Sequence, residues 1–138
     1  MKSAAPLLMV VDDDEDIREV LKLFLEVEGY RVVTAVDGRD ALQQLQTREQ
    51  PSLILLDLMM PGMDGEQFMN VIRRGAFAAI PVVITSGHRE ASNKVIELNA
   101  NCCLMKPVVY DDLMAVVHRF APNGQAVVET SEKRDRKG

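Results

Sequence analysis

Short apolar runs alternate along the chain with segments in which apolar residues recur at helical spacing. Five runs have the length and aliphatic content of β-strands, and they cover residues 7–11, 30–35, 53–56, 82–84 and 102–105. Four of them are almost entirely apolar, which is typical of strands covered on both faces in a parallel sheet. The run 30–35 is more polar, as a strand at the edge of a sheet can be. The pattern therefore predicts five strands.

The segments between these runs predict five helices, each with an apolar stripe on one face. The stripes consist of Ile17, Val20, Leu21 and Phe24; Ala41, Leu42 and Leu45; Phe68, Met69 and Ile72; Ala91, Val95 and Leu98; and Leu113, Val116, Val117 and Phe120. The fourth helix, within residues 88–98, has the weakest pattern. Asp64 and Gln67 have the spacing of a capping box at the start of the third helix, and Gly75 predicts its end.

Strands that alternate with helices favour right-handed crossovers and a parallel sheet between two helical layers. We therefore expect an α/β fold of the doubly wound (βα)5 type over residues 1–121. Residues 122–138 carry four basic and three acidic side chains and almost nothing to bury, so we expect them to form a disordered polar tail.

Composition and charge narrow the possible functions. The 138 residues carry 16 basic and 21 acidic side chains, for a net charge of −5, which argues against a nucleic-acid-binding surface. No apolar run approaches the roughly 20 residues that a membrane-spanning helix needs. The two cysteines, Cys102 and Cys103, are adjacent and make poor disulfide partners within one strand, which favours a reducing, cytoplasmic location.

Polar residues follow or end four of the predicted strands. Asp12 and Asp13 follow the first, Asp57 ends the third, Thr85 ends the fourth, and Lys106 follows the fifth. In a doubly wound sheet the carboxyl ends of the strands lie at one edge, where ligands bind. We therefore expect these five residues to meet at that edge.

Three carboxylates and one ammonium group leave this cluster with a formal charge of −2. Two carboxylates about 4 Å apart repel each other by ~4 kcal/mol at an effective dielectric constant near 20. A divalent cation would neutralise the excess, and an all-oxygen donor set suits a hard ion such as Mg²⁺ or Mn²⁺. A carboxylate in this setting can attack phosphorus and form an acyl phosphate, which makes Asp57 the candidate phosphoryl acceptor.

Four motifs together resemble the receiver domain of a two-component response regulator. They are VVDDDEDIR at 10–18, ILLDLMMPGMDG at 54–65, VVITSG at 82–87 and MKP at 105–107. The resemblance covers about residues 6–120. It implies the flavodoxin-like fold with strand order 2-1-3-4-5, as in stand-alone chemotaxis regulators.

The resemblance also implies a role for each polar residue at this edge. Asp57 would be phosphorylated, Asp13 would bind the metal ion directly, and Asp12 would act largely through water. The backbone carbonyl of Met59 would complete the metal shell. Two further residues would contact the phosphoryl group, Lys106 through its ammonium and Thr85 through its hydroxyl.

The resemblance implies a signalling protein rather than an enzyme that turns over an external substrate. A histidine kinase or histidine phosphotransfer protein would supply the phosphoryl group from a phosphohistidine, in a Mg²⁺-dependent reaction. The chain would catalyse its own phosphorylation and dephosphorylation. Phosphorylation would reshape the face formed by the fourth helix, fifth strand and fifth helix, and a downstream protein would bind there. No membrane partner is implied.

Two local features complete the prediction. Lys106-Pro107 is a candidate cis bond, because X-Pro bonds adopt cis at low cost. Cys103 stands three positions before Lys106, where relatives commonly carry an aromatic residue whose ring turns inward on activation. The chemistry of the site is expected to survive this change, but a relay through a rotating ring is not available here.

Two other classes share part of the pattern. A phosphatase of the haloacid-dehalogenase type would use Asp12 as its nucleophile within Asp12-Asp13-Asp14. Asp16, however, stands where that motif needs Thr or Val, and Asp57 would have no role. A flavin-binding electron carrier would need a Gly/Ser/Thr-rich phosphate loop after the first strand, and the sequence has none there.

Overall fold

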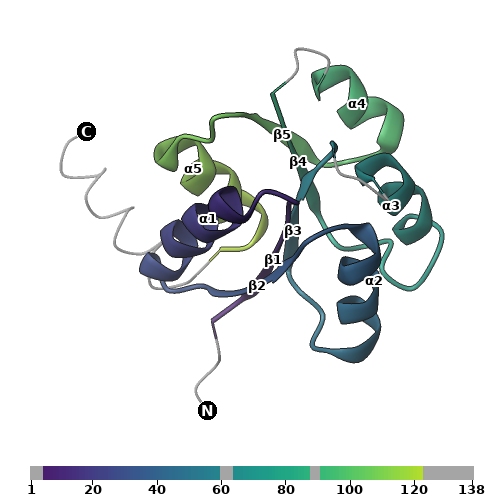
Figure 1. Cartoon of the computed structure of the whole chain (residues 1–138), viewed down its shortest axis with the longest axis horizontal. Helices are drawn as coiled ribbons and strands as arrows, with labels where there is room; N and C mark the ends of the chain where they lie inside the picture. Colours follow the sequence, from purple (N-terminus) through teal and green to yellow (C-terminus); the bar gives the residue numbers. More distant parts are fainter. Residues whose placement is uncertain (1–4, 60–63, 88–90, 123–138) are drawn as a thin grey trace.

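The fold is built on one parallel sheet. The computed structural model describes residues 5–59, 64–87 and 91–122. Its five strands are β1 (Leu7–Val11), β2 (Arg31–Ala35), β3 (Leu53–Asp57), β4 (Val82–Ser86) and β5 (Cys102–Met105). They are parallel and lie in the order β2-β1-β3-β4-β5 (Figure 1). The predicted doubly wound, flavodoxin-like arrangement is confirmed, with β2 at an edge as expected.

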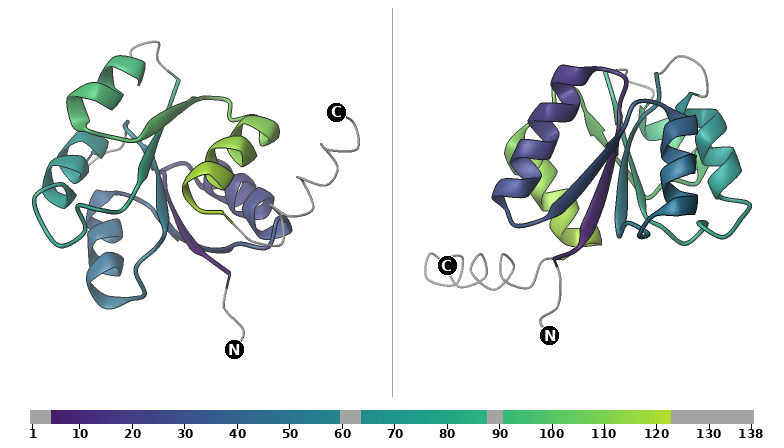
Figure 2. Two further views of the ribbon diagram at one scale, coloured as in Figure 1. Left: turned by 180° about the vertical axis from the view of Figure 1, so that it is seen from behind. Right: turned by 60° about the horizontal axis from the view of Figure 1, so that its bottom comes forward.

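Helices cover both faces of the sheet. On one face lie α1 (Glu15–Val27) and α5 (Tyr110–Phe120), and on the other lie α2 (Gly38–Thr47), α3 (Gly65–Ile72) and α4 (Ala91–Leu98) (Figures 1 and 2). None of the helices in the described residues is long and apolar enough to cross a membrane.

The hydrophobic core has two halves, one on each face of the sheet. Alternate residues of a strand point to opposite faces. Leu8 and Val10 of β1 accordingly pack with the cluster that contains residues of α1 and α5, whereas Met9 and Val11 pack with residues of α2 and α3. Because both faces are covered, every residue of β1, β3 and β4 is buried.

The structure corrects the predicted face of α1. Val20 is 47% exposed, whereas Leu21 and Leu25 are fully buried. Successive helix residues are about 100° apart, so a helix whose buried stripe is centred on Leu21 and Leu25 turns Val20 towards solvent. The stripes predicted for α2, α3 and α5 are confirmed as core-facing.

Several element boundaries also differ from the prediction. The capping box of Asp64 and Gln67 is present at the start of α3, but α3 ends at Ile72 with Arg73 as its C-cap, ahead of the predicted end at Gly75. β4 continues two residues beyond the predicted run. The fourth helix is described from Ala91 to Leu98. Residues 88–90 of its predicted range and residues 123–138 of the predicted tail lie outside the described residues.

Candidate functional site

The sheet brings the predicted site residues to one edge. Asp12 directly follows β1, Asp57 is the last residue of β3, and Lys106 directly follows β5. Thr85 lies in β4 as the register partner of Asp57, so the two residues are neighbours on adjacent strands. The cluster expected from the ends of the strands is therefore present, and the first helix begins beside it.

The acidic part of the cluster contains three carboxylates. One oxygen from each of Asp12, Asp13 and Asp57 lies within 4.8 Å of the other two. Asp12 is 1% exposed and Asp57 4% exposed, while Asp13 is open to solvent. An all-carboxylate donor set with one open side fits a hard divalent cation that keeps part of its water shell, as Mg²⁺ does.

Lys106 is the counter-charge of the two buried carboxylates. Its Nζ lies 3.0 Å from Oδ2 of Asp12 and 3.3 Å from Oδ1 of Asp57. Burial alone would lower the pKa of Lys106, but the hydrogen bond that its ammonium donates to Asp12 and the negative charges of both carboxylates raise that pKa above its ordinary value. The ammonium group therefore stays protonated at neutral pH and bridges β1 and β3 from the end of β5.

The surroundings of Asp57 disfavour the ionised form of its carboxyl group. Burial raises the pKa of its carboxyl group, and the charge of Asp12 raises it further. The ammonium of Lys106 and the backbone N–H of Met59, which donates to Oδ1 at 3.2 Å, act in the opposite direction and only partly offset that rise. A cation bound beside Asp57 would stabilise the ionised carboxylate and lower its pKa, which is a physical reason for the site to bind a cation.

Asp12 is held by groups that sequence reasoning only partly anticipated. The backbone N–H of Asp14 donates to its Oδ1 at 2.9 Å. Arg18 was not predicted to take part, yet its Nη1 donates to the backbone carbonyl of Asp12 at 2.8 Å. Arg18 lies in the first turn of α1, shortly after Asp12 in the chain, and this position could have indicated the contact. Asp14 is the N-cap of α1, and its side chain accepts from the backbone N–H groups of Asp16 and Ile17.

The start of α3 packs directly against the segment that follows Asp57. The N–H of Gly65 donates to the carbonyl of Leu58 at 3.1 Å. A Cβ atom at Gly65 would lie 2.6 Å from Cα of Leu58 and 2.8 Å from the carbonyl oxygen of Asp57. Only glycine fits at this position, so Gly65 sets how closely α3 approaches the main chain of Asp57.

The far side of the site is formed by β4 and β5. The N–H of Lys106 donates to the carbonyl of Ser86 at 2.8 Å, and the predicted cis bond between Lys106 and Pro107 is present. Cys103 is half-buried, and burial followed by the neighbouring Cys102 raises the pKa of its thiol. Both cysteines are free, and Cys103 lies two residues from the end of β5.

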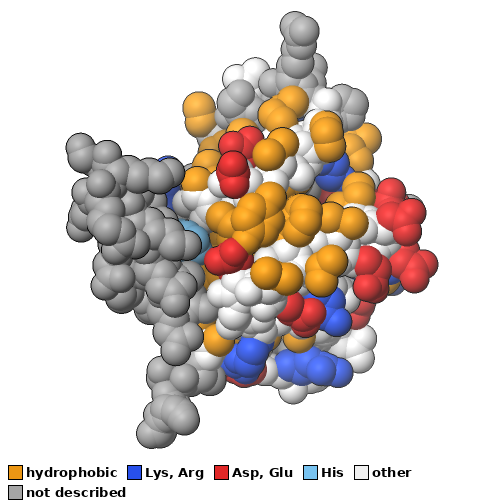
Figure 3. Space-filling model, turned by 90° about the vertical axis from the view of Figure 1, so that its left-hand side faces the viewer, with side chains coloured by type: hydrophobic (Ala, Val, Ile, Leu, Met, Phe, Trp, Pro, Cys, Tyr) orange, Lys and Arg blue, Asp and Glu red, His pale blue; other side chains and the backbone are white. Residues whose placement is uncertain are grey.

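An apolar hollow adjoins Lys106 on the side covered by α1 and α5. It is lined by residues of α1, including Ile17 and Val20, and by Lys106, Pro107 and Val108. Figure 3 shows hydrophobic side chains gathered across this side of the molecule, and α1 contributes Val20, Leu23 and Val27, which are 47%, 60% and 70% exposed. The site thus opens beside a surface suited to protein contact.

Comparison with known sequences identifies relatives for most of the chain. The family model described as response regulator receiver domain matches residues 8–118. The transcriptional regulatory protein CpxR homolog of Haemophilus influenzae is 39% identical over 110 residues, which make up 78% of this chain and 47% of that protein. The alkaline phosphatase synthesis transcriptional regulatory protein PhoP of Bacillus subtilis is 33% identical over 130 residues, or 93% and 53%. The chain spans about half the length of these curated relatives.

Solved structures give the same result. A putative response regulator from Chloroflexus aurantiacus matches with a TM-score of 0.80 and 30% identity, over 85% of this chain and 98% of that one. A response regulator receiver protein from Pseudomonas putida matches with a TM-score of 0.79 and 31% identity, over 86% and 99%. Together with the acidic cluster and the strand order, these matches show that the chain belongs to the response regulator receiver domain family.

Proposed function

We propose that this chain is the phosphoryl acceptor of a two-component signalling system and that Asp57 is the residue that becomes phosphorylated. The observation that carries the proposal is the position of the Asp57 carboxylate. It is buried, lies 3.3 Å from the ammonium of Lys106, and shares a 4.8 Å cluster with oxygens of Asp12 and Asp13. A carboxylate that lies beside an ammonium group, in an acidic cluster that suits a divalent cation, is placed to attack phosphorus and form an acyl phosphate.

In the proposed step, a carboxylate oxygen of Asp57 attacks the phosphorus atom of a phosphohistidine on the partner. The new O–P bond forms as the N–P bond breaks, and the imidazole keeps the electron pair and takes up a proton from water. Hydrolysis of the acyl phosphate later returns Asp57 to its carboxylate form. The chain thus promotes its own phosphorylation and dephosphorylation and turns over no other substrate.

Four residues would hold Mg²⁺ or Mn²⁺ at this site, namely Asp12, Asp13 and Asp57 through carboxylates and Met59 through its backbone carbonyl. When bound, the ion supplies positive charge next to the transferring oxygens. The Lys106 ammonium neutralises the phosphoryl group from the other side. Thr85, the register neighbour of Asp57, donates its hydroxyl to a phosphoryl oxygen.

The phosphodonor is a histidine kinase or a histidine phosphotransfer protein, which docks over the apolar surface of α1. The hollow between α1 and the segment after β5 supports this proposal, because it leads from exposed Val20 directly to Lys106. A donor helix that packs there would bring its histidine to the edge of the sheet. A kinase-facing protein of this kind acts in the cytoplasm.

The output surface lies on α4, β5 and the start of α5. Phosphorylation adds negative charge and new acceptor oxygens at Asp57, which draw Thr85 inward. Exposed apolar side chains support this surface, with Ile96 on α4, Met105 on β5 and Val109 before α5 at 83%, 48% and 55% exposure. A downstream protein binds this surface, and Cys103 offers no aromatic ring that could rotate to relay the change.

The phosphatase alternative has less support in the surroundings of Asp12. Both oxygens of that carboxylate are engaged, Oδ1 by the N–H of Asp14 and Oδ2 by Lys106, and the residue is 1% exposed. A nucleophile in that position would first have to lose its ion pair. The matched relatives are regulatory proteins and receiver domains.

Mass spectrometry after incubation with a small phosphodonor tests the proposal. With Mg²⁺ we expect one added phosphoryl group, located at Asp57 by peptide mapping, and none in EDTA or in Asp57→Asn. Glu49→Gln, a change on the exposed far end of the sheet, is the matched control and should label like the unmodified protein. Labelling at Asp12 would establish the phosphatase alternative instead, and equal labelling without metal would contradict the proposed site.

A further inference from the structure

The C-terminal end of α4 is attached to the fold more firmly than the middle of the helix, and this asymmetry does not involve the phosphorylation chemistry. We propose that Arg73 clamps the C-terminal end of α4 to α3 and β4, and that α4 moves by swinging about this clamped end. Hinges of this kind consist of a few residues at the end of an element. The end that swings is then the one that follows β4 in the chain.

Arg73, the C-cap of α3, donates hydrogen bonds to four acceptors in two separate segments. Its Nη1 donates to the carbonyl oxygens of Ala78 and Ile80, which precede β4, at 2.9 and 3.0 Å. Its Nε donates to the carbonyl oxygen of Asn99 at 3.0 Å, and its Nη2 donates to Oδ1 of Asn101 at 3.2 Å. Asn99 and Asn101 lie between α4 and β5. One side chain thus joins the ends of α3 and α4 to the segment that enters β4.

The surroundings of Arg73 make these hydrogen bonds strong. A guanidinium that donates to oxygen acceptors forms charge-assisted hydrogen bonds, which are about twice as strong as neutral ones. Arg73 is half-buried, and burial lowers the pKa of its guanidinium, which nevertheless stays charged at neutral pH. A partly desolvated cation that loses its acceptors keeps the cost of its desolvation. Opening of the clamp is therefore unfavourable.

The turn that Arg73 holds also closes α4. Asn99 has a φ of 60°, in the left-handed region that glycine or asparagine commonly occupies after a helix. Its N–H donates to the carbonyl of Ile96 at 3.3 Å, and the N–H of Ala100 donates to the carbonyl of Val95 at 2.9 Å. These two bonds form a Schellman motif, which satisfies the last carbonyl groups of a helix. The C-terminal end of α4 is thus fixed by its own main chain as well as by Arg73.

Asn101 connects this turn to the sheet. Its Oδ1 accepts from the N–H of Val82 at 2.9 Å as well as from Arg73, and its own N–H donates to the carbonyl of Val82 at 2.8 Å. Apolar packing occurs at the same end of α4, since Leu98 and Ala100 lie against the core on this face of the sheet. Polar and apolar contacts therefore hold the C-terminal end of α4 together.

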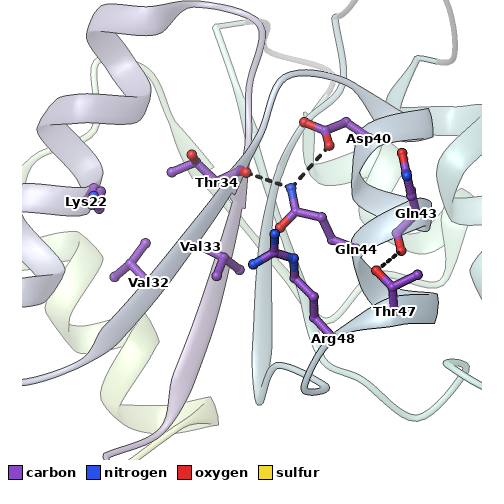
Figure 4. Close-up of a pocket in the computed structure, with 9 residues that line it drawn as sticks. All are labelled: Lys22, Val32, Val33, Thr34, Asp40, Gln43, Gln44, Thr47 and Arg48. Atoms are coloured by element: carbon purple, nitrogen blue, oxygen red, sulfur yellow. Dashed lines mark hydrogen bonds between the residues drawn. The ribbon is translucent and has the colours of Figure 1, made fainter.

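The middle of α4 has a weaker attachment. Nζ of Lys94 pairs with Glu66 of α3 at 3.0 Å, but both side chains are partly exposed to solvent, which weakens such a pair. Ile96 is exposed. Helix α2, on the same face of the sheet, is attached differently, because Nε2 of Gln44 in its middle donates to the carbonyl of Thr34 in β2 at 2.8 Å (Figure 4). A hydrogen bond into the sheet thus fixes α2 at mid-length, whereas a solvent-exposed ion pair holds α4 there.

A helix that is clamped at one end can change position and keep its core contacts at that end. The clamped end of α4 leads into β5 and from there to Lys106, while the other end follows β4, which contains Thr85. A swing about the clamp therefore leaves β5 and Lys106 in place and displaces the end of α4 that follows Thr85. The clamp does not depend on Asp57, so its failure would leave the proposed phosphorylation untouched.

Amide hydrogen exchange with single-residue resolution tests the clamp on the full chain. In the unmodified protein we expect the N–H of Ala100, corrected for its intrinsic rate, to exchange roughly ten-fold more slowly than the N–H of Ile96, because the clamped end opens less often. The N–H of Leu55, in the buried strand β3, reports global unfolding. In Arg73→Gln the exchange rate of Ala100 relative to Leu55 should rise roughly ten-fold, because the local opening loses its restraint.

Arg74→Gln is the matched control, because it removes the same charge at the exposed neighbouring position. It should leave the rate of Ala100 relative to Leu55 unchanged within about two-fold. Should Arg73→Gln fail to fold, Asn101→Ala removes one of the four acceptors and should raise the same relative rate by about three-fold.

Three results would overturn the proposal. Equal exchange of Ile96 and Ala100 in the unmodified protein would show that α4 opens as one unit. A relative rate of Ala100 that stays the same when its Arg73 contacts are removed would show that Arg73 does not clamp the helix. An equal rise in Arg74→Gln would show that the loss of a surface charge, and not the loss of the clamp, opens this turn.

Discussion

Helices α3 and α4 are both eight residues long, and each follows a strand that carries a site residue, yet they are attached very differently. α3 follows Asp57, begins with a capping box and buries Phe68, Met69 and Ile72. α4 follows Thr85, and within its described side chains, residues 93–98, none is fully buried. Ile96 is 83% exposed.

Ionic contacts accompany the partial packing of α4, whose Leu98 lies against the core cluster without being fully buried. Nζ of Lys94 lies 3.0 Å from Glu66 of α3 and 3.1 Å from Glu97. Ion pairs that are this exposed to solvent contribute little to the free energy of unfolding, whereas buried apolar side chains contribute several kcal/mol. Asp57, the proposed phosphoryl acceptor, thus leads into a helix with a buried face. Thr85, which we propose contacts the phosphoryl group, leads into a helix whose described side chains are at most partly buried. This division is what a two-state regulator requires.

The largest predicted effect is a matched substitution on the two helices. Ile72→Ala on α3 should lower the free energy of unfolding by about 2–5 kcal/mol, because it leaves a cavity at a residue that is 1% exposed. Ile96→Ala on α4 should change it by no more than about 0.5 kcal/mol. Urea denaturation measures both. Similar losses in the two variants would break the comparison.

A pair of glycines tests how α3 is fixed to Asp57. Gly65→Ala should lower stability by about 1–3 kcal/mol, because the added Cβ would lie 2.6 Å from the backbone of Leu58. It should also reduce phosphorylation of Asp57, whose main chain must move. Gly75→Ala is the control, since nothing lies within 4 Å of its Cβ, and it should change stability by under about 0.5 kcal/mol. Unfolding curves that show Gly65→Ala to be as mild as the control would refute the tight approach.

Metal binding should stabilise the acidic cluster next to α3. Mg²⁺ at ten times its dissociation constant adds about 1.4 kcal/mol to the free energy of unfolding, which raises the melting temperature by ~5 °C for a chain of this size. Asp13→Asn should remove most of this rise, and should raise the melting temperature of the metal-free protein because it relieves repulsion among the carboxylates. Thermal melts in EDTA and in Mg²⁺ check both statements. A metal-free Asp13→Asn protein that melts lower would contradict the repulsion argument.

The smallest predicted effect on global stability concerns the ionic tie of α4. Lys94→Gln should cost at most about 0.5 kcal/mol, because the pair is partly exposed to solvent. It should nevertheless speed amide exchange within α4 several-fold, since local opening needs less energy there. Lys22→Gln, which breaks the loose 3.9 Å pair with Glu26 on α1, is the control and should leave α4 unchanged. If exchange in α4 is unaffected by Lys94→Gln, other contacts hold the helix.

The strands and most helix faces could be predicted because their periodicity reflects burial directly. Two-sided burial makes β1, β3 and β4 apolar throughout, and α3 and α5 face the core as their stripes require. The face of α1 was predicted wrongly at Val20, because α1 is apolar around more than half of its circumference. Exposed Leu23 and Val27 extend this surface, and local periodicity cannot separate a core face from a binding face.

The candidate site could be located from the sequence but not in its details. The carboxyl ends of parallel strands meet at one edge, so Asp12, Asp57 and Lys106 were expected to be neighbours. The closer approach of Lys106 to Asp12, at 3.0 Å, depends on side-chain conformations that spacing does not encode. The same holds for Gly65, whose role follows from a tertiary contact with Leu58.

Hydrogen exchange measured by mass spectrometry before and after phosphorylation tests the central contrast most directly. With Mg²⁺ and a small phosphodonor, we expect exchange to change in peptides that cover Thr85 and α4 and to stay constant in α3, with no change at all in Asp57→Asn. An equal change in α3 and α4, or a change that persists in Asp57→Asn, would contradict the account of a fixed acceptor beside a movable helix.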